Sequence, residues 1–196
     1  MNTKFRLKYE RLRRDGKFRE FAETLQRLGP IDSREHFNSY CREACRLWTQ
    51  EVEKGRHARS QLFNELLDKI QQHKEATIST LWGGVVVTLY EHPRVEKYLV
   101  IERGHYLSLE KHDEKIENLE VLEGAGLLLW RTSPGPELEL EAIAPGSRFH
   151  FTPGIEHCLI GTEDLLVFEK STDPKGMDKD LIFIYEPDGD VAKLSS

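Results

Sequence analysis

The hydrophobic periodicity of the chain changes near residue 75. Before this point, apolar residues recur at three- and four-residue steps, as Phe21, Leu25 and Leu28 do, and this spacing is typical of amphipathic helices. After it, short β-rich apolar runs such as "GVVVTLY" and "KYLVIER" alternate with turn residues, which is the pattern of strands. The two patterns predict an N-terminal helical region over residues 1–75 and a β domain over residues 76–190.

The β region contains about ten such runs, with no helical run between them. Parallel neighbours would need long crossover connections, which are usually helical, so the strands should pair antiparallel. This predicts a mainly β fold, an antiparallel barrel or jelly roll, preceded by the helical segment. The helices are expected to pack on the outside of the barrel or to mediate a dimer.

The composition limits the partners that the protein can have. The formal net charge of -6 argues against bulk attraction to nucleic acid or to an anionic membrane, since both are negative. The chain has no apolar run of membrane-spanning length, and its N-terminus lacks the apolar core of a secretory signal, so we expect a cytoplasmic protein. The expected partner is a small-molecule substrate, with no nucleic acid and no membrane.

One hairpin carries an unusual density of ionisable groups. The stretch 110–124 reads "EKHDEKIENLEVLEG" and lies between two strand-like runs. Strand alternation places Ser108, Glu110 and His112 on one face, and Tyr106 should join them. Glu117, on the returning strand, would oppose them if that face is the interior.

A fourth group, His157, follows the Pro-Gly turn in "TPGIEHCLIG" and opens another short strand. Two carboxylates and two imidazoles inside a barrel are costly unless they are paired or bound to a cation. A divalent metal would satisfy them. The rest of the charged stretch is expected to form a solvated turn: Lys111, Asp113, Glu114 and Lys115.

The spacing of these residues resembles the two motifs of the cupin superfamily. The first motif is matched by Gly104, five residues, Glu110, one residue, His112, four residues, Glu117, six residues and Gly124. Glu110 stands where the family has its first His. The second motif is approximated by Gly146, Pro153, Gly154 and His157, and the resemblance covers roughly residues 78–186.

The resemblance implies a cupin jelly roll in which His112, Glu117 and His157 are metal ligands and Glu110 takes the remaining position. A carboxylate in place of an imidazole shifts preference toward harder ions, so manganese or iron is favoured and zinc is possible. The alternative is a vestigial site in which Glu110 faces solvent or pairs with a lysine of the turn, Lys111 or Lys115.

The runs around both motifs resemble the sugar-phosphate isomerase branch of cupins, including phosphomannose isomerases. This implies isomerisation of a sugar or sugar phosphate, in which a metal polarises an oxygen while Glu110 or Glu169 moves a proton. An anionic substrate would need cations at the mouth of the site, for which the candidates are Arg103, Arg131, Arg148 and Lys170.

Two other functions remain open. The first is a cupin dioxygenase, because the barrel is shared and only the ion and its open positions differ. The second is a non-enzymatic cupin that binds a small ligand or acts in regulation. Exposed edge strands favour a homodimer in either case.

Overall fold

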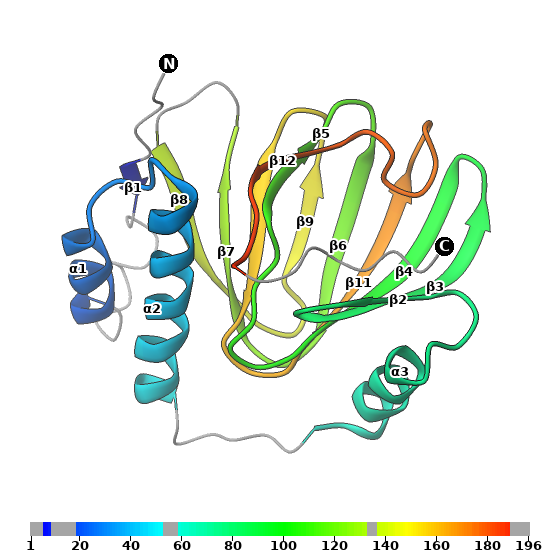
Figure 1. Cartoon of the computed structure of the whole chain (residues 1–196), viewed down its shortest axis with the longest axis horizontal. Helices are drawn as coiled ribbons and strands as arrows, with labels where there is room; N and C mark the ends of the chain where they lie inside the picture. The colour runs from blue at the N-terminus through cyan, green and yellow to red at the C-terminus, as the bar shows by residue number, and fades with distance from the viewer. Residues whose placement is uncertain (1–5, 9–18, 53–58, 133–136, 189–196) are drawn as a thin grey trace.

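The structure is a computed structural model that describes residues 6–8, 19–52, 59–132 and 137–188. Its strands form two six-stranded sheets that face each other (Figure 1). The first sheet has the order β1-β8-β7-β10-β5-β12, with bounds β1 Arg6–Lys8, β5 Leu109–His112, β7 Gly126–Arg131, β8 Glu137–Ile143, β10 Glu156–Gly161 and β12 Leu181–Tyr185.

The second sheet has the order β2-β3-β4-β11-β6-β9. Its strands are β2 Thr77–Thr80, β3 Gly83–Glu91, β4 Arg94–Ile101, β6 Ile116–Glu123, β9 Arg148–Phe151 and β11 Leu165–Thr172. All neighbours in both sheets pair antiparallel except β1 and β8, which are parallel. The predicted mainly β jelly roll is confirmed, and β1 is a strand that the periodicity did not predict.

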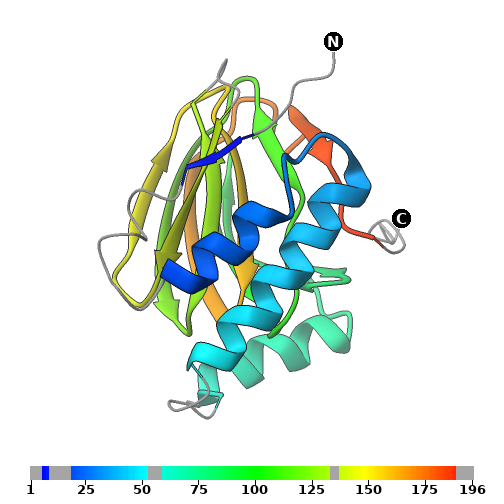
Figure 2. The same ribbon diagram turned by 90° about the vertical axis from the view of Figure 1, so that its left-hand side faces the viewer.

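Three helices, α1 (Arg19–Arg27), α2 (Arg34–Val52) and α3 (Gln61–Gln71), precede the second sheet in the sequence. Figures 1 and 2 show α1 and α2 outside the first sheet and α3 against the second. In the described part of the chain, no helix has the length and apolar character needed to cross a membrane.

Each helix layer shares a buried cluster with the sheet that it covers. Residues of α1 and α2 pack with the outer face of the first sheet, and this cluster includes Leu25, Phe37, Cys41, Leu109 and Leu127. Residues of α3 pack with the second sheet in a cluster that includes Phe63, Ile70, Val86, Val100 and Leu166. The prediction that the helices pack on the outside of the barrel is confirmed.

A third cluster fills the space between the sheets. It includes Leu99, Val121, Leu128, Leu159 and Val167. Successive strand residues point to opposite faces, so β5, β6, β10 and β11 each send alternate side chains into this interior. The polar residues of these strands therefore meet at the end of the interior where the apolar cluster stops.

Candidate metal centre

A cavity of about 230 Å³ lies between the two sheets. Its polar lining contains all four predicted metal ligands and the second predicted proton carrier, together with two lysines, a serine and an aspartate. These residues are Lys97, Ser108, Glu110, His112, Lys115, Glu117, His157, Glu169 and Asp178. Strand alternation turns Glu110, His112, Glu117 and His157 inward, as the sequence predicts. The predicted hairpin is wrong, however, because β5 and β6 lie in different sheets and Glu117 reaches the others across the interior.

Three of these side chains are in direct contact. Nε2 of His112 lies 3.6 Å from Oε1 of Glu117, and Nε2 of His157 lies 3.2 Å from Oε2 of the same carboxylate. All three residues are buried. Glu110 lies on β5 directly opposite His157 on β10, so it borders the same group.

Both imidazole rings are oriented by their second nitrogen. Nδ1 of His112 lies 2.8 Å from Oδ1 of Asp180, and Nδ1 of His157 lies 3.3 Å from the carbonyl oxygen of Ile155. The ring of Phe151 stacks on His157 with 4.2 Å between centroids. A neutral imidazole that donates from Nδ1 keeps its lone pair on Nε2, so in that form each ring would offer Nε2 as a metal ligand beside Glu117.

Opposite charges shift the pKa values of the pair formed by Glu117 and His157. Burial acts to raise the pKa of Glu117, but the hydrogen bond and charge of His157, with the charge of Lys115, hold it well below its usual range. Burial acts to lower the pKa of His157, but Glu117 outweighs it and the net shift is upward. Without a metal, the pair is therefore stabilised as carboxylate and imidazolium.

Glu110 has a different environment from Glu117. Its half-buried side chain borders the cavity and accepts a hydrogen bond from the hydroxyl of Ser108. Burial raises the pKa of Glu110, although the charge of His157 opposes the shift. Glu110 thus faces the cavity. The vestigial alternative placed it in open solvent instead.

The prediction that Lys115 lies in a solvated turn is wrong. Its side chain is 1% exposed, and Nζ lies 2.7 Å from Oε1 of Glu117, 2.7 Å from Oε1 of Glu169 and 2.5 Å from Oδ1 of Asp178. The backbone explains this, because Oδ2 of Asp180 accepts the N–H groups of Glu114 and Lys115. These bonds hold the end of the turn against the barrel, so the lysine points inward.

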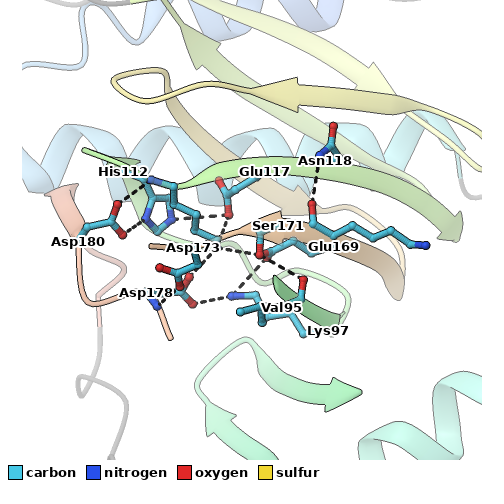
Figure 3. A network of polar contacts seen from close by, with 12 residues as sticks. Val95, Lys97, His112, Glu117, Asn118, Glu169, Ser171, Asp173, Asp178 and Asp180 are labelled. Carbon is cyan, nitrogen blue, oxygen red and sulfur yellow. Dashed lines mark hydrogen bonds and ion pairs between the residues drawn. The ribbon is translucent and has the colours of Figure 1, made fainter. Parts of the chain in front are cut away.

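A second lysine completes a buried charge network beside the histidines (Figure 3). Nζ of Lys97 lies 3.3 Å from Oε2 of Glu169 and 2.5 Å from Oδ2 of Asp178. Glu169 therefore has an ammonium group at each of its two oxygens, the other being that of Lys115. Asp178 bridges the same two lysines.

Sequence reasoning missed Lys97, Asp178 and Asp180. Lys97 lies two residues from both Val95 and Leu99 in a strand-like run, so it shares their apolar face. This spacing was a usable signal of an inward-facing charge. The two aspartates lie on the connection between β11 and β12, where Asp173 accepts the backbone N–H of Asp178 at 2.8 Å. No local pattern predicts the path of such a connection.

The expectation that Tyr106 faces the interior is wrong, and alternation did not settle the facing of the candidate cations. Tyr106 packs in the cluster under α2 and donates a hydrogen bond to Asn38, because the alternation breaks before β5 and both Leu107 and Ser108 face the cavity. The cations suggested for the mouth also lie outside the cavity lining. Those with defined acidic partners are Arg131 with Glu156, Arg148 with Glu120 and Lys170 with Glu96.

The donor set has the chemistry of a divalent metal site, but its members pair with one another. Within the described ranges, no three or more His, Cys, Asp or Glu side chains are already spaced to hold an ion. A metal at His112, Glu117 and His157 would replace the direct contacts of the imidazoles with the carboxylate. The oriented Nε2 atoms and the excess of carboxylates over ammonium groups both fit a cation there.

The fold and the positions of the motif residues together define a cupin-type jelly roll. Two crystal structures of the capsular polysaccharide assembling protein CapF from Staphylococcus aureus are similar to this chain, with 15% and 13% identity and a TM-score of 0.50 each. Each match covers 56% of this chain and 34% or 32% of CapF. These likenesses concern the fold.

Other comparisons are more distant. An oxalate decarboxylase from Lactobacillus farciminis has 15% identity and a TM-score of 0.47, over 55% of this chain and 33% of that one. The chain thus matches about a third of the length of these proteins. No family model matches the sequence, and no curated protein matches it.

Proposed function

We propose that the protein is a metal-dependent cupin enzyme that isomerises a small hydroxy-carbonyl compound, of which a sugar or sugar phosphate is the example implied by sequence resemblance. The observation that supports this most is the meeting of two oriented imidazoles, Glu117 and Glu110 at one cavity. Such a site can hold a cation and a proton carrier side by side.

His112, Glu117 and His157 would hold the metal, for which manganese or iron is favoured and zinc is possible. When bound, such an ion supplies Lewis-acid polarisation of a substrate oxygen. Asp180 keeps His112 in the tautomer that presents Nε2, and the carbonyl of Ile155 does so for His157. These contacts fix the ligands before any ion arrives, which strengthens binding.

Glu110 is the better of the two predicted proton carriers. Both oxygens of Glu169 lie beside lysine ammonium groups, so this carboxylate serves as their counter-ion. Glu110 borders the cavity, and its raised pKa brings it closer to neutral pH, where a general base works best. It would take a proton from the carbon that bears the hydroxyl group and return it to the carbonyl carbon, while the hydroxyl proton moves between the two oxygens.

The test is an assay of aldose-ketose interconversion over a panel of sugars and sugar phosphates with manganese-loaded protein. A Glu110→Gln variant should lose about 100-fold or more in rate. Glu114→Gln is the matched control, because this exposed residue of the connection between β5 and β6 pairs with Lys175 outside the cavity. Inactivity of the wild type on the whole panel, with metal present at one equivalent, would rule out isomerisation of these compounds.

A cupin dioxygenase is the second candidate. The hydrogen bond from Ser108 to Glu110 supports it, because a Glu110 held in this way leaves His112, Glu117 and His157 as a two-His, one-carboxylate set with open positions. Substrate-dependent oxygen uptake by iron-loaded protein would favour this chemistry over isomerisation.

A homodimer in the cytoplasm remains part of the proposal. α1 and α2 cover the outer face of the first sheet, and α3 covers the β2–β4 part of the second. Pairing would use a sheet edge such as β9, which ends the second sheet. Sedimentation equilibrium at micromolar concentration tests this directly. A single species of 22.8 kDa would exclude the dimer.

A further inference from the structure

The geometry points to an uncharged substrate that carries an apolar group next to its carbonyl head, and this inference rests on the proposed function. It narrows the substrate class, because phosphorylated sugars and other anions are excluded. Two independent features of the cavity support it: the charge balance of its floor and the chemistry of its walls.

Among the described residues of the floor, no lysine or arginine is left to pair with an anionic substrate. Among the cavity-lining residues in the part of the chain that the structure describes, Lys97 and Lys115 are the only lysines or arginines. Both are buried, and each already contacts two or three carboxylate groups at 2.5 to 3.3 Å. A substrate phosphate would have to displace one of these buried carboxylates.

The net charge of the floor is negative rather than positive. The two ammonium groups face three carboxylates, those of Glu117, Glu169 and Asp178. Asp180 adds a fourth at His112. Glu110, the proposed base, adds a fifth at the same cavity. A divalent cation then leaves this set with one net negative charge. A neutral substrate head adds no charge to it, whereas a phosphate dianion adds two more negative charges.

The walls of the cavity are mainly apolar. They include Ile78, Leu81, Trp82, Leu107, Phe183 and Pro187. Leu81 and Phe183 are each 49% exposed, although large apolar side chains at a surface gain by being covered. An alkyl or aryl group of the substrate would cover them while its carbonyl head reaches the histidines.

The experiment is isothermal titration of manganese-loaded protein with three probes that share a hydroxy-ketone head. Hydroxyacetone is the short neutral probe, 1-hydroxyhexan-2-one adds three methylene groups, and dihydroxyacetone phosphate adds a dianion. Since each buried methylene is worth about fourfold in affinity, the longer probe should bind at least about tenfold tighter than hydroxyacetone. The phosphate should bind no tighter than hydroxyacetone.

A rim variant checks where the apolar group binds. Leu81→Ser/Phe183→Ser should reduce the advantage of the longer probe to about threefold or less, since burial of its chain is lost. Leu28→Ser is the control, because Leu28 is similarly exposed at 43% and lies outside the cavity lining. An unchanged advantage in the rim variant would overturn the inference.

Binding and turnover separate the inference from the proposed function. Tighter binding of the phosphate, equal affinity of the two neutral probes, or no binding of any probe would overturn the inference. Selective binding of the longer neutral probe without any isomerisation would leave the inference standing and contradict the isomerase. Efficient turnover of a sugar phosphate would support the isomerase and overturn the inference.

Discussion

Oδ1 of Asp180 lies 2.8 Å from Nδ1 of His112, and both side chains are buried. The carboxylate comes from the connection between β11 and β12, whereas the imidazole ends β5. A carboxylate at this nitrogen fixes the tautomer of a ligating histidine and increases its basicity. Asp180→Asn should therefore weaken manganese binding by about 10- to 100-fold, measured by isothermal titration.

Asp113→Asn provides the control for this change. Asp113 is exposed in the turn that follows His112, so its substitution removes the same charge from the same region without touching the imidazole. Equal affinities of the two variants would show that Asp180 does not orient a metal ligand.

Metal analysis of two variants separates the role of Glu110 from that of His157. His157→Ala removes a nitrogen that points at Glu117, so purified protein should lose most of its metal. Glu110→Gln should retain metal at close to one equivalent, because the Ser108 hydroxyl already engages this side chain. Loss of metal in both variants would establish Glu110 as a fourth ligand, as the cupin spacing implies.

The metal-free protein should become less stable as the pH rises above about 6.5. Glu117 outweighs burial and raises the pKa of His157, so the folded state binds this proton more tightly than the unfolded chain does. The resulting stabilisation is complete below the unfolded pKa of about 6.5 and is lost as the pH rises through the folded pKa. Burial also raises the pKa of Glu110. The free energy of unfolding should therefore fall for this group too as the pH rises above about 4.3.

Urea unfolding between about pH 6 and 9 measures this dependence, with a limit of about 1.4 kcal/mol per pH unit for one proton. His157→Gln should flatten the curve over this range. His150→Gln should not, since His150 is an exposed residue paired with Asn118 on the outer face. A wild-type curve that is already flat would mean that His157 is neutral without metal.

Strand alternation explains why the sequence predicted the candidate site better than its surroundings. Glu110 and His112 are two residues apart on β5, so the local rule of alternation places both on the inward face. Glu117 lies on β6, which belongs to the opposite sheet, so it meets them across the interior and not across the predicted hairpin. The motif spacing then adds His157. The same rule failed for Tyr106, because Leu107 and Ser108 both face the cavity.

The buried charge network could not be predicted in the same way. Asp178 and Asp180 reach the site because β12 pairs with β5, where Leu181 lies opposite His112, although these residues are far apart in sequence. Lys115 appeared to be a turn residue, and turn lysines are usually solvated. Its burial depends on the bond that its N–H donates to Asp180, which is a tertiary contact.

Removing the charge of Lys115 should destabilise the fold strongly. Lys115→Met leaves Glu117, Glu169 and Asp178 without their shared ammonium group, and breaking a buried ion pair typically costs about 3–5 kcal/mol. Guanidinium unfolding measures the loss. Lys111 lies nearby on β5 and is only partly buried, so Lys111→Met should change the free energy of unfolding by no more than about 0.5 kcal/mol.

The double variant Lys115→Met/Asp178→Asn tests the coupling within the network. Both single variants break the contact of Lys115 with Asp178, so the double variant should lose less stability than the sum of the two. Strict additivity would show that the contact contributes no net energy.

The two glycines of the first cupin motif make a matched pair for a test of backbone packing. Gly104 and Gly124 have φ values of 83° and 80°. Alanine at either position would have to adopt the left-handed backbone conformation, at a cost of about 1–2 kcal/mol. A Cβ at Gly104 would meet nothing within 4 Å, whereas at Gly124 it would lie 2.0 Å from the carbonyl oxygen of Asp164. Gly124→Ala should therefore lose about 1–3 kcal/mol more than Gly104→Ala in urea unfolding, or fail to fold. Equal losses of stability in the two variants would mean that the backbone at Asp164 can move away from the added Cβ. Gly124 would then be needed only for its φ angle.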